Sequence, residues 1–179
     1  KMWLLHLRED GEVIGSYRYK VGSVDTAGWE ILKESTGHYL ILGTRLADYA
    51  LFLLRLDSDF DVVGTRAFNM RMPASFAQTP SGDIVIGADG GRDFRIVWLT
   101  KNLNIIVAQK YDSGYVDALH DIIATSDGGV LVVGKTEDEV AILKLEADGD
   151  IEWSKVYRYS SCFDWAWSAV QTSDGGFAI

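Results

Sequence analysis

The chain has 179 residues, of which 47% are apolar and 12% aromatic, and this composition excludes a disordered or low-complexity segment. Its net charge of −9 excludes the basic electrostatic footprint with which proteins bind nucleic acid or anionic membranes. No stretch reaches the roughly 20 apolar residues that cross a bilayer, so we expect no membrane span.

Glycine and cysteine usage narrows the class of fold. The 18 glycines and 2 prolines fit many tight turns between short strands, because glycine reaches the positive φ values that such turns need. One cysteine, Cys162, excludes an intramolecular disulfide framework and a multi-cysteine zinc site. We expect Cys162 to be a small, partly buried structural residue.

The first predicted element returns three times along the chain. Residues 4–13 read as an apolar strand, a polar turn and the start of a second strand. The same pattern recurs at residues 53–62, 96–105 and 142–151. If Gly11, Phe60, Leu103 and Gly149 are equivalent, the repeat is about 46 residues long.

A second landmark recurs in phase with the first. It is a Gly-containing turn followed by an apolar run that closes on Gly43, Gly87 or Gly134. Residues 172–179 repeat the turn and the start of the run. Two landmarks with one spacing make a chance pattern implausible.

Each repeat predicts four short strands, which in the third full unit span residues 119–125, 130–134, 140–145 and 151–157. Residues 67–77 come closest to a helix, but Arg71 and Pro73 interrupt the pattern, so we predict a loop and then a strand. Four strands in 40 to 50 residues are typical of a propeller blade. The sequence therefore predicts an all-β fold, a β-propeller built of four-stranded antiparallel blades.

These units resemble the tandem propeller-like repeats of archaeal and bacterial proteins. The resemblance rests on Trp-Ser-Lys-Val-Tyr at 153–157, Asp-Trp-Ala-Trp-Ser at 164–168, the turn at 172–177 and Lys-Leu-Glu-Ala-Asp-Gly at 144–149. It is strong from about Tyr111 onward, whereas residues 72–75 and 103–107 depart from the pattern. The resemblance implies a fold that is frequent on secreted or surface proteins, so an extracellular location is an expectation; it implies no single activity.

The repeats divide the chain into an outer half-blade (residues 1–18), three blades (19–69, 70–111 and 112–158) and an inner half-blade (159–179). Unpaired strand edges promote aggregation, so the half-blades should find partners. A larger ring is the favoured arrangement, because the chain stops before the equivalent of Val133-Gly134. Two chains that form eight blades as a homo-oligomer, or a closed ring of four blades, are the alternatives.

Acidic turns occur in three of the four repeats, and alternating carboxylates are found in calcium loops. The EF-hand spacing fails, however, because counting from Asp57 places Val62 and Phe68 where that loop needs Gly and Glu. We interpret these turns as solvated hairpins, and the Thr-Ser-Asp-Gly-Gly segments as side-chain-capped turns. No metal or other cofactor is predicted.

The loops that precede the first strand of each blade are rich in aromatic residues near carboxylates, a combination that stacks on sugars or holds peptides. The predicted ligand-binding residues are Trp29, Glu30, Tyr115, His120, Asp121, Trp165 and Trp167. The alternative is that these rings pack between blades. A protein or a carbohydrate is the expected partner.

Catalytic signatures are sparse in the sequence. His6, His38 and His120 fall at non-equivalent points of their repeats, and no nucleophile stands in a recognisable elbow. We therefore predict a non-enzymatic module for protein or glycan binding or surface assembly. The alternative is a propeller enzyme, either a hydrolase or quinone-dependent, because residues 148–153 resemble the Gly-x-x-x-Trp turn of quinone-dependent dehydrogenases.

Overall fold

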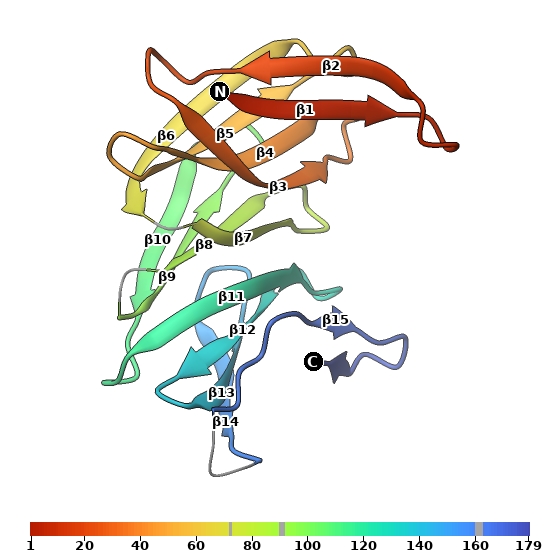
Figure 1. Cartoon of the computed structure of the whole chain (residues 1–179). Coiled ribbons are helices and arrows are strands. Elements are labelled where there is room, and N and C mark those ends of the chain that lie inside the picture. The colour runs from red at the N-terminus through yellow and green to blue at the C-terminus, as the bar shows by residue number, and fades with distance from the viewer. Residues whose placement is uncertain (72, 90–91, 160–162) are drawn as a thin grey trace. The chain divides into compact units, whose positions relative to one another are not determined.

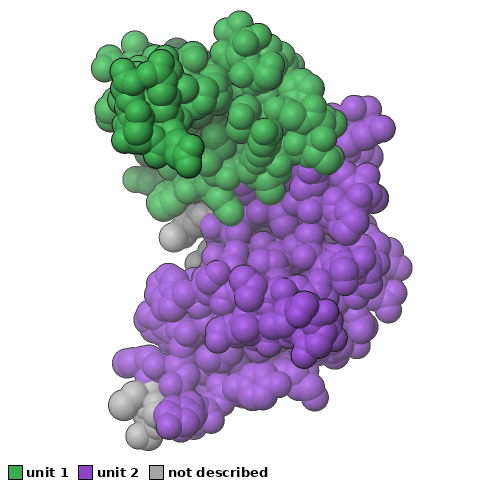
Figure 2. Space-filling model, turned by 90° about the vertical axis from the view of Figure 1, so that its right-hand side faces the viewer, with its two compact units in different colours: residues 1–72 green, residues 73–179 purple. Residues whose placement is uncertain are grey.

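The computed structural model describes residues 1–71, 73–89, 92–159 and 163–179, and Cys162 lies outside these ranges. The chain divides into two compact units, Lys1–Met72 and Pro73–Ile179 (Figure 2). The described residues form strands and turns without a helix, which confirms the predicted all-β class. They accordingly include no helix that is long and apolar enough to cross a membrane.

The first unit contains a hairpin and a four-stranded antiparallel sheet (Figure 1). The hairpin pairs β1 (Met2–Leu7) with β2 (Val13–Tyr19). The sheet has the order β3 (Thr26–Lys33), β4 (Tyr39–Arg45), β5 (Ala50–Leu56) and β6 (Val62–Arg71).

The second unit contains two such sheets and a short hairpin (Figure 1). One sheet comprises β7 (Pro73–Gln78), β8 (Ile84–Asp89), β9 (Phe94–Leu99) and β10 (Ile105–Tyr111). The other comprises β11 (Asp117–Ala124), β12 (Val130–Thr136), β13 (Glu139–Leu145) and β14 (Ile151–Tyr157). The hairpin pairs β15 (Val170–Gln171) with β16 (Phe177–Ala178).

The prediction of a loop at the start of residues 67–77 is wrong. Strand β6 continues to Arg71, because Ala67 pairs with Phe52 and Phe68 pairs with Leu51 of β5. The Phe68 side chain is buried and ties this extension to the core. Pro73 is the first residue of β7, a place in a strand that proline tolerates.

The turn between the third and fourth strands has the same backbone geometry in every repeat. Gly11, Phe60, Leu103 and Gly149 all have positive φ, from 62° to 92°. Each N–H donates to the carbonyl three residues earlier, as from Gly149 to Glu146 over 3.0 Å. A tyrosine at the end of a neighbouring strand reaches two of these turns: Tyr19 donates to the Phe60 carbonyl and Tyr111 to that of Gly149.

The core lies on the middle strands, whose apolar runs are buried on both faces. Leu53 of β5 and Ile96 of β9 are fully buried. The closing glycines of the apolar runs stand where the backbone is crowded. A Cβ on Gly134 would lie 2.1 Å from the Ala118 carbonyl oxygen, so this position excludes a side chain.

Carboxylates in the turns bind their own backbone. Asp57 Oδ1 accepts hydrogen bonds from the N–H groups of Asp59 (3.0 Å) and Asp61 (2.9 Å). In the Thr-Ser-Asp-Gly-Gly turn, Asp127 Oδ1 accepts from Gly129 N–H over 2.9 Å. The described residues contain no group of three or more His, Cys, Asp and Glu that is arranged to hold a metal ion.

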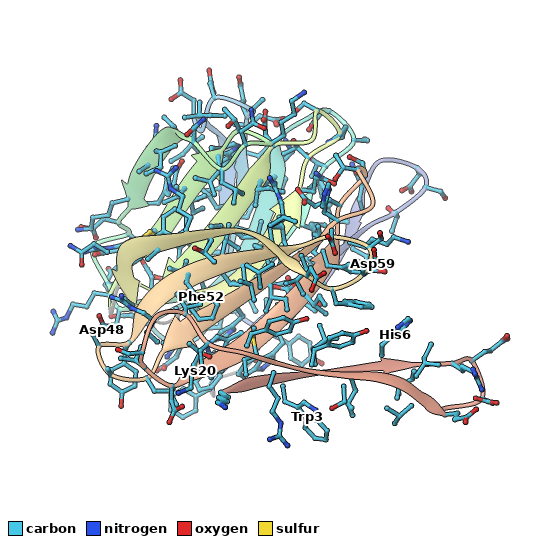
Figure 3. The ribbon with its side chains drawn as sticks, turned by 90° about the horizontal axis from the view of Figure 1, so that it is seen from above. Trp3, His6, Lys20, Asp48, Phe52 and Asp59 are labelled. Carbon is cyan, nitrogen blue, oxygen red and sulfur yellow. The ribbon has the colours of Figure 1, made fainter. Side chains whose placement is uncertain are left out.

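The β1–β2 hairpin covers one face of the first sheet. In Figure 3, Trp3 and His6 project from opposite faces of the hairpin. The His6 ring lies 4.9 Å from the ring of Phe60, whereas Trp3 is 61% exposed. His6 is exposed as well, but its ring contacts the hydrophobic cluster at Phe60.

Candidate ligand-binding site

The first strand of each four-stranded sheet carries a β-bulge at an equivalent point. The pairing register shifts between Gly28 and Glu30, between Pro73 and Ser75, and between Leu119 and Asp121. A bulge adds one residue and redirects its side chain. Trp29, Ala74 and His120 occupy these extra positions, so the bulges re-aim two of the predicted ligand-binding residues.

In the second unit, the imidazole of His120 lies face to face with the indole of Trp167. The ring centroids are 4.1 Å apart and the planes are inclined by 7°. His120 Nδ1 lies 2.7 Å from the Ala166 carbonyl oxygen, which can only accept a hydrogen bond, so Nδ1 carries the proton. In the neutral ring, Nε2 is then the acceptor.

Two further exposed rings, Trp165 and Phe163, extend this stacked pair. Trp165 lies 6.1 Å from Trp167 with the planes inclined by 59°, and Phe163 lies 5.9 Å from Trp165. Lys135 Nζ stands 4.6 Å from the centre of the Trp165 ring, within the range of a cation–π contact. Phe163, Trp165 and Trp167 are 70%, 40% and 66% exposed. We call these three rings, with His120 and Lys135, the aromatic patch.

Asp121, the residue after His120, binds the segment that carries Trp167 through hydrogen bonds. Its Oδ1 accepts a hydrogen bond from the Ser75 hydroxyl, and its Oδ2 accepts from the Ser168 hydroxyl and the Ala169 N–H, each over 3.0 Å. These donors come from β7 and from the segment before β15. Because both oxygens are engaged, Asp121 positions the chain that carries Trp167.

The predicted site residues therefore fall into three groups. His120, Asp121, Trp165 and Trp167 come together at the patch. Trp29 and Glu30 lie on β3 of the first unit, where Trp29 donates from Nε1 to the Thr44 hydroxyl over 2.7 Å. Tyr115 stands in the turn before β11, where its N–H donates to the Ser113 hydroxyl. The alternative interpretation was that these rings are buried between sheets. Trp29 and Trp167 do not fit it, because they are 63% and 66% exposed.

Two residues of the patch were absent from the predicted set. Phe163 is visible in the sequence as one more aromatic residue of its loop. Lys135 directly follows the closing Gly134, at the end of β12. Its position next to the connection between the second and third strands was the signal that could have identified it, because we expect ligands of propellers to gather at such connections.

Comparisons with known proteins identify the architecture. No family model and no curated protein matches the sequence. A protein of unknown function from Bacteroides caccae matches 98% of this chain with a TM-score of 0.67 and 13% identity. Virginiamycin B lyase from Staphylococcus aureus matches 98% with a TM-score of 0.65 and 16% identity, and the Dos1 propeller matches 89% with a TM-score of 0.61 and 13% identity.

Identities of 13% to 16% show a shared fold and carry no information about activity. The fold is a β-propeller with four-stranded antiparallel sheets, as predicted: the described residues form three such sheets, β3–β6, β7–β10 and β11–β14, and two hairpins. The matches cover 60%, 55% and 44% of the three solved chains, so this chain spans about half of their length.

Proposed function

We propose that the chain is part of a propeller module that binds a glycan without chemical turnover, through the aromatic patch. The observation that carries this proposal is the exposure of the Trp165 and Trp167 rings, whose planes are inclined by 59°. Indole faces stack on the apolar C–H faces of sugar rings, and inclined faces suit successive or branched sugars.

Polar groups beside the rings supply the hydrogen bonds that a sugar needs. His120 Nε2 accepts from a hydroxyl, since Nδ1 donates to the Ala166 carbonyl. The Lys135 ammonium donates from the side of Trp165. A few polar groups that converge on an apolar surface are typical of small-molecule sites.

A protein partner is the second form of the same binding function. Tryptophan and charged groups at an exposed cluster also serve as anchors in protein interfaces. The inclined rings favour a glycan, because a flat protein surface would leave one of the two faces uncovered.

An enzyme is the alternative class, and one observation favours it. The hydrogen bond from Nδ1 fixes the tautomer of His120, as in many general bases. One of the solved propellers of similar fold is named a lyase. In an enzyme of this kind His120 would take a proton at Nε2.

Titration of the chain with a panel of neutral and acidic oligosaccharides, followed by tryptophan fluorescence and calorimetry, tests the proposal. Trp167→Ala and Trp165→Ala should each weaken binding about tenfold or more, the effect of about 1.4 kcal/mol. Trp3→Ala removes an equally exposed tryptophan from the other unit and should leave the affinity unchanged. Binding that survives both patch substitutions, or no binding across the panel, would overturn the proposal.

Product analysis separates the two classes. A binding module returns each oligosaccharide unchanged, with wild-type protein and with His120→Ala. Conversion of a substrate by the wild type that stops in His120→Ala would establish the enzyme instead.

A further inference from the structure

The β1–β2 hairpin exposes an apolar face of a kind that is buried in the complete sheets. Leu5 and Leu7 of β1 are 41% and 47% exposed. Their equivalents on β13, Leu143 and Leu145, are 6% and 0% exposed and belong to a cluster that the β7–β10 sheet shares. Side chains alternate along a strand, so Leu5 and Leu7 point away from His6, whose ring contacts the first sheet (Figure 3). We call the side of β1 that carries Leu5 and Leu7 the hairpin face.

The same hairpin has an open strand edge. Its turn at Gly11 identifies β1 and β2 as the third and fourth strands of a repeat. In a complete sheet the third strand also pairs with the second, as Lys144 of β13 does with Leu131 of β12. Among the described strands, β1 pairs with β2 alone. The other edge of β1 therefore presents backbone groups that can pair with a further strand.

The β15–β16 hairpin corresponds to the first and second strands of a repeat. In its turn the Gly175 N–H donates to the Thr172 carbonyl over 3.0 Å, as the Gly128 N–H does to the Thr125 carbonyl between β11 and β12. Within the part of the chain that the structure describes, β16 pairs with β15 alone. The two hairpins thus present complementary halves of one four-stranded sheet.

A tyrosine contact between successive repeats is also open at these two places. The tyrosines that end β2 and β10 each donate to a carbonyl in the turn of the next sheet, as Tyr111 does to Gly149. Tyr157 is the equivalent residue of β14, is 55% exposed, and donates to no residue in the described ranges. The Gly11 turn accepts no such bond from these ranges either. The chain therefore carries one free tyrosine and one free turn of this contact.

We propose that two copies of this chain associate through these surfaces. The β1–β2 hairpin of one copy would dock beside β16 and over β14 of the other, and two-fold symmetry would form the contact twice. By alignment with β12 and β13, β1 would pair with β16 so that His6 stands opposite Ala178. The hairpin face would then be covered, and Tyr157 would donate to the Gly11 carbonyl of the other copy.

A second copy is the partner that fits, because one chain carries both complementary surfaces. The chain spans 60%, 55% and 44% of the three solved propellers, so two copies supply about as much chain as one of them. This arrangement is the homo-oligomer that the repeat pattern left open. It is separate from the aromatic patch and does not depend on the proposed glycan function.

Sedimentation equilibrium of the chain tests the proposal and should show the mass of two chains as concentration rises. Leu7→Glu should weaken association at least about tenfold, because a carboxylate would be buried against apolar side chains. Tyr157→Phe should weaken it about fivefold or more, because each of the two contacts loses a hydrogen bond. Val63→Glu and Tyr49→Phe are the matched controls, since they change exposed residues elsewhere, and should leave association unchanged. Circular dichroism checks that each variant folds.

Disulfide trapping identifies the paired strands. In a Cys162→Ser background, His6→Cys and Ala178→Cys should form a disulfide between chains when the two single variants are mixed, because directly paired residues lie within disulfide range. Each variant alone should form far less of it. The double-cysteine variant should yield two covalently joined chains on a non-reducing gel.

Three results would overturn the proposal. The first is the mass of one chain at all concentrations. The second is a dimer whose dissociation constant ignores both Leu7→Glu and Tyr157→Phe. The third is a disulfide that forms within single chains of the double-cysteine variant, which would show that β1 and β16 of the same copy pair.

Discussion

Ser75 and Asp121 join the first strands of two neighbouring blades: the Ser75 hydroxyl on β7 donates to Asp121 Oδ1 on β11 over 3.0 Å. The second oxygen of Asp121 accepts from Ser168 and Ala169, in the next repeat. One carboxylate therefore connects three successive repeats of the second unit.

This arrangement predicts that Asp121→Ala is strongly destabilising. Three donors would lose their acceptor, and partly buried donors without a partner are costly, so we expect a loss of about 2–4 kcal/mol in the free energy of unfolding. Urea denaturation measures it. Asp148→Ala is the matched control, because Asp148 accepts one hydrogen bond in an exposed turn and its loss should cost less than about 1 kcal/mol. Equal effects of the two substitutions would contradict the connecting role of Asp121.

Two tryptophans of the second unit should respond differently to truncation. Trp167 is 66% exposed and contacts His120 and Trp165, so Trp167→Ala should cost about 1 kcal/mol or less. Trp98 is 2% exposed in the core of its sheet, so Trp98→Ala should cost about 3–5 kcal/mol. Thermal and urea unfolding compare them. A cost for Trp167→Ala as large as that for Trp98→Ala would show that its ring is a core residue.

Much of this fold was predictable because the repeat carries its own landmarks. The strand predicted at residues 151–157 is β14 as observed, and that predicted at 119–125 overlaps β11, which begins at Asp117. A turn that needs positive φ recurs at Gly149 and its equivalents, so its spacing marks each repeat.

The patch was predictable only in part. The sequence displays Trp165 and Trp167, but a tryptophan in a repeat protein is equally suited to burial, and sequence does not report exposure. The bulge at His120 was hidden as well, because alternation with a period of two does not reveal one added residue. Lys135 meets Trp165 only once β12 packs against the segment before β15.

Gly134 should be intolerant of any side chain. A Cβ there would lie 2.1 Å from the Ala118 carbonyl oxygen on the paired strand, and a backbone atom of a central sheet moves little. Gly134→Ala should therefore cost about 2 kcal/mol or more, measured by urea denaturation. At Gly64 the nearest atom to a Cβ is Arg55 Cβ at 3.7 Å, so Gly64→Ala should change stability by less than about 1 kcal/mol. A well-tolerated Gly134→Ala would mean that β11 and β12 are less closely paired than described.

Two tyrosines should ionise late when pH is raised. Burial is the main cause that raises the pKa values of Tyr19 and Tyr111 from 10.0 to about 12, and nearby aspartates add to it. Each hydroxyl also donates to the carbonyl of a turn, Phe60 for Tyr19 and Gly149 for Tyr111. In an ultraviolet titration of the folded protein, two of the 8 tyrosines should thus appear near pH 12.

The same shifts make the fold sensitive to alkali. In the unfolded chain these phenols ionise near pH 10, below their pKa in the folded state, so the unfolded state loses protons first. Their contribution to stability is therefore complete below pH 10 and disappears as pH rises to about 12. Tyr111→Phe should remove one late phenol, and the double variant with Tyr19→Phe should remove both and flatten the loss of stability between pH 10 and 12. If phenols that ionise near pH 12 persist in the double variant, they belong to other tyrosines. That result would contradict the effect assigned to the buried Tyr19 and Tyr111 and their hydrogen bonds to the turns.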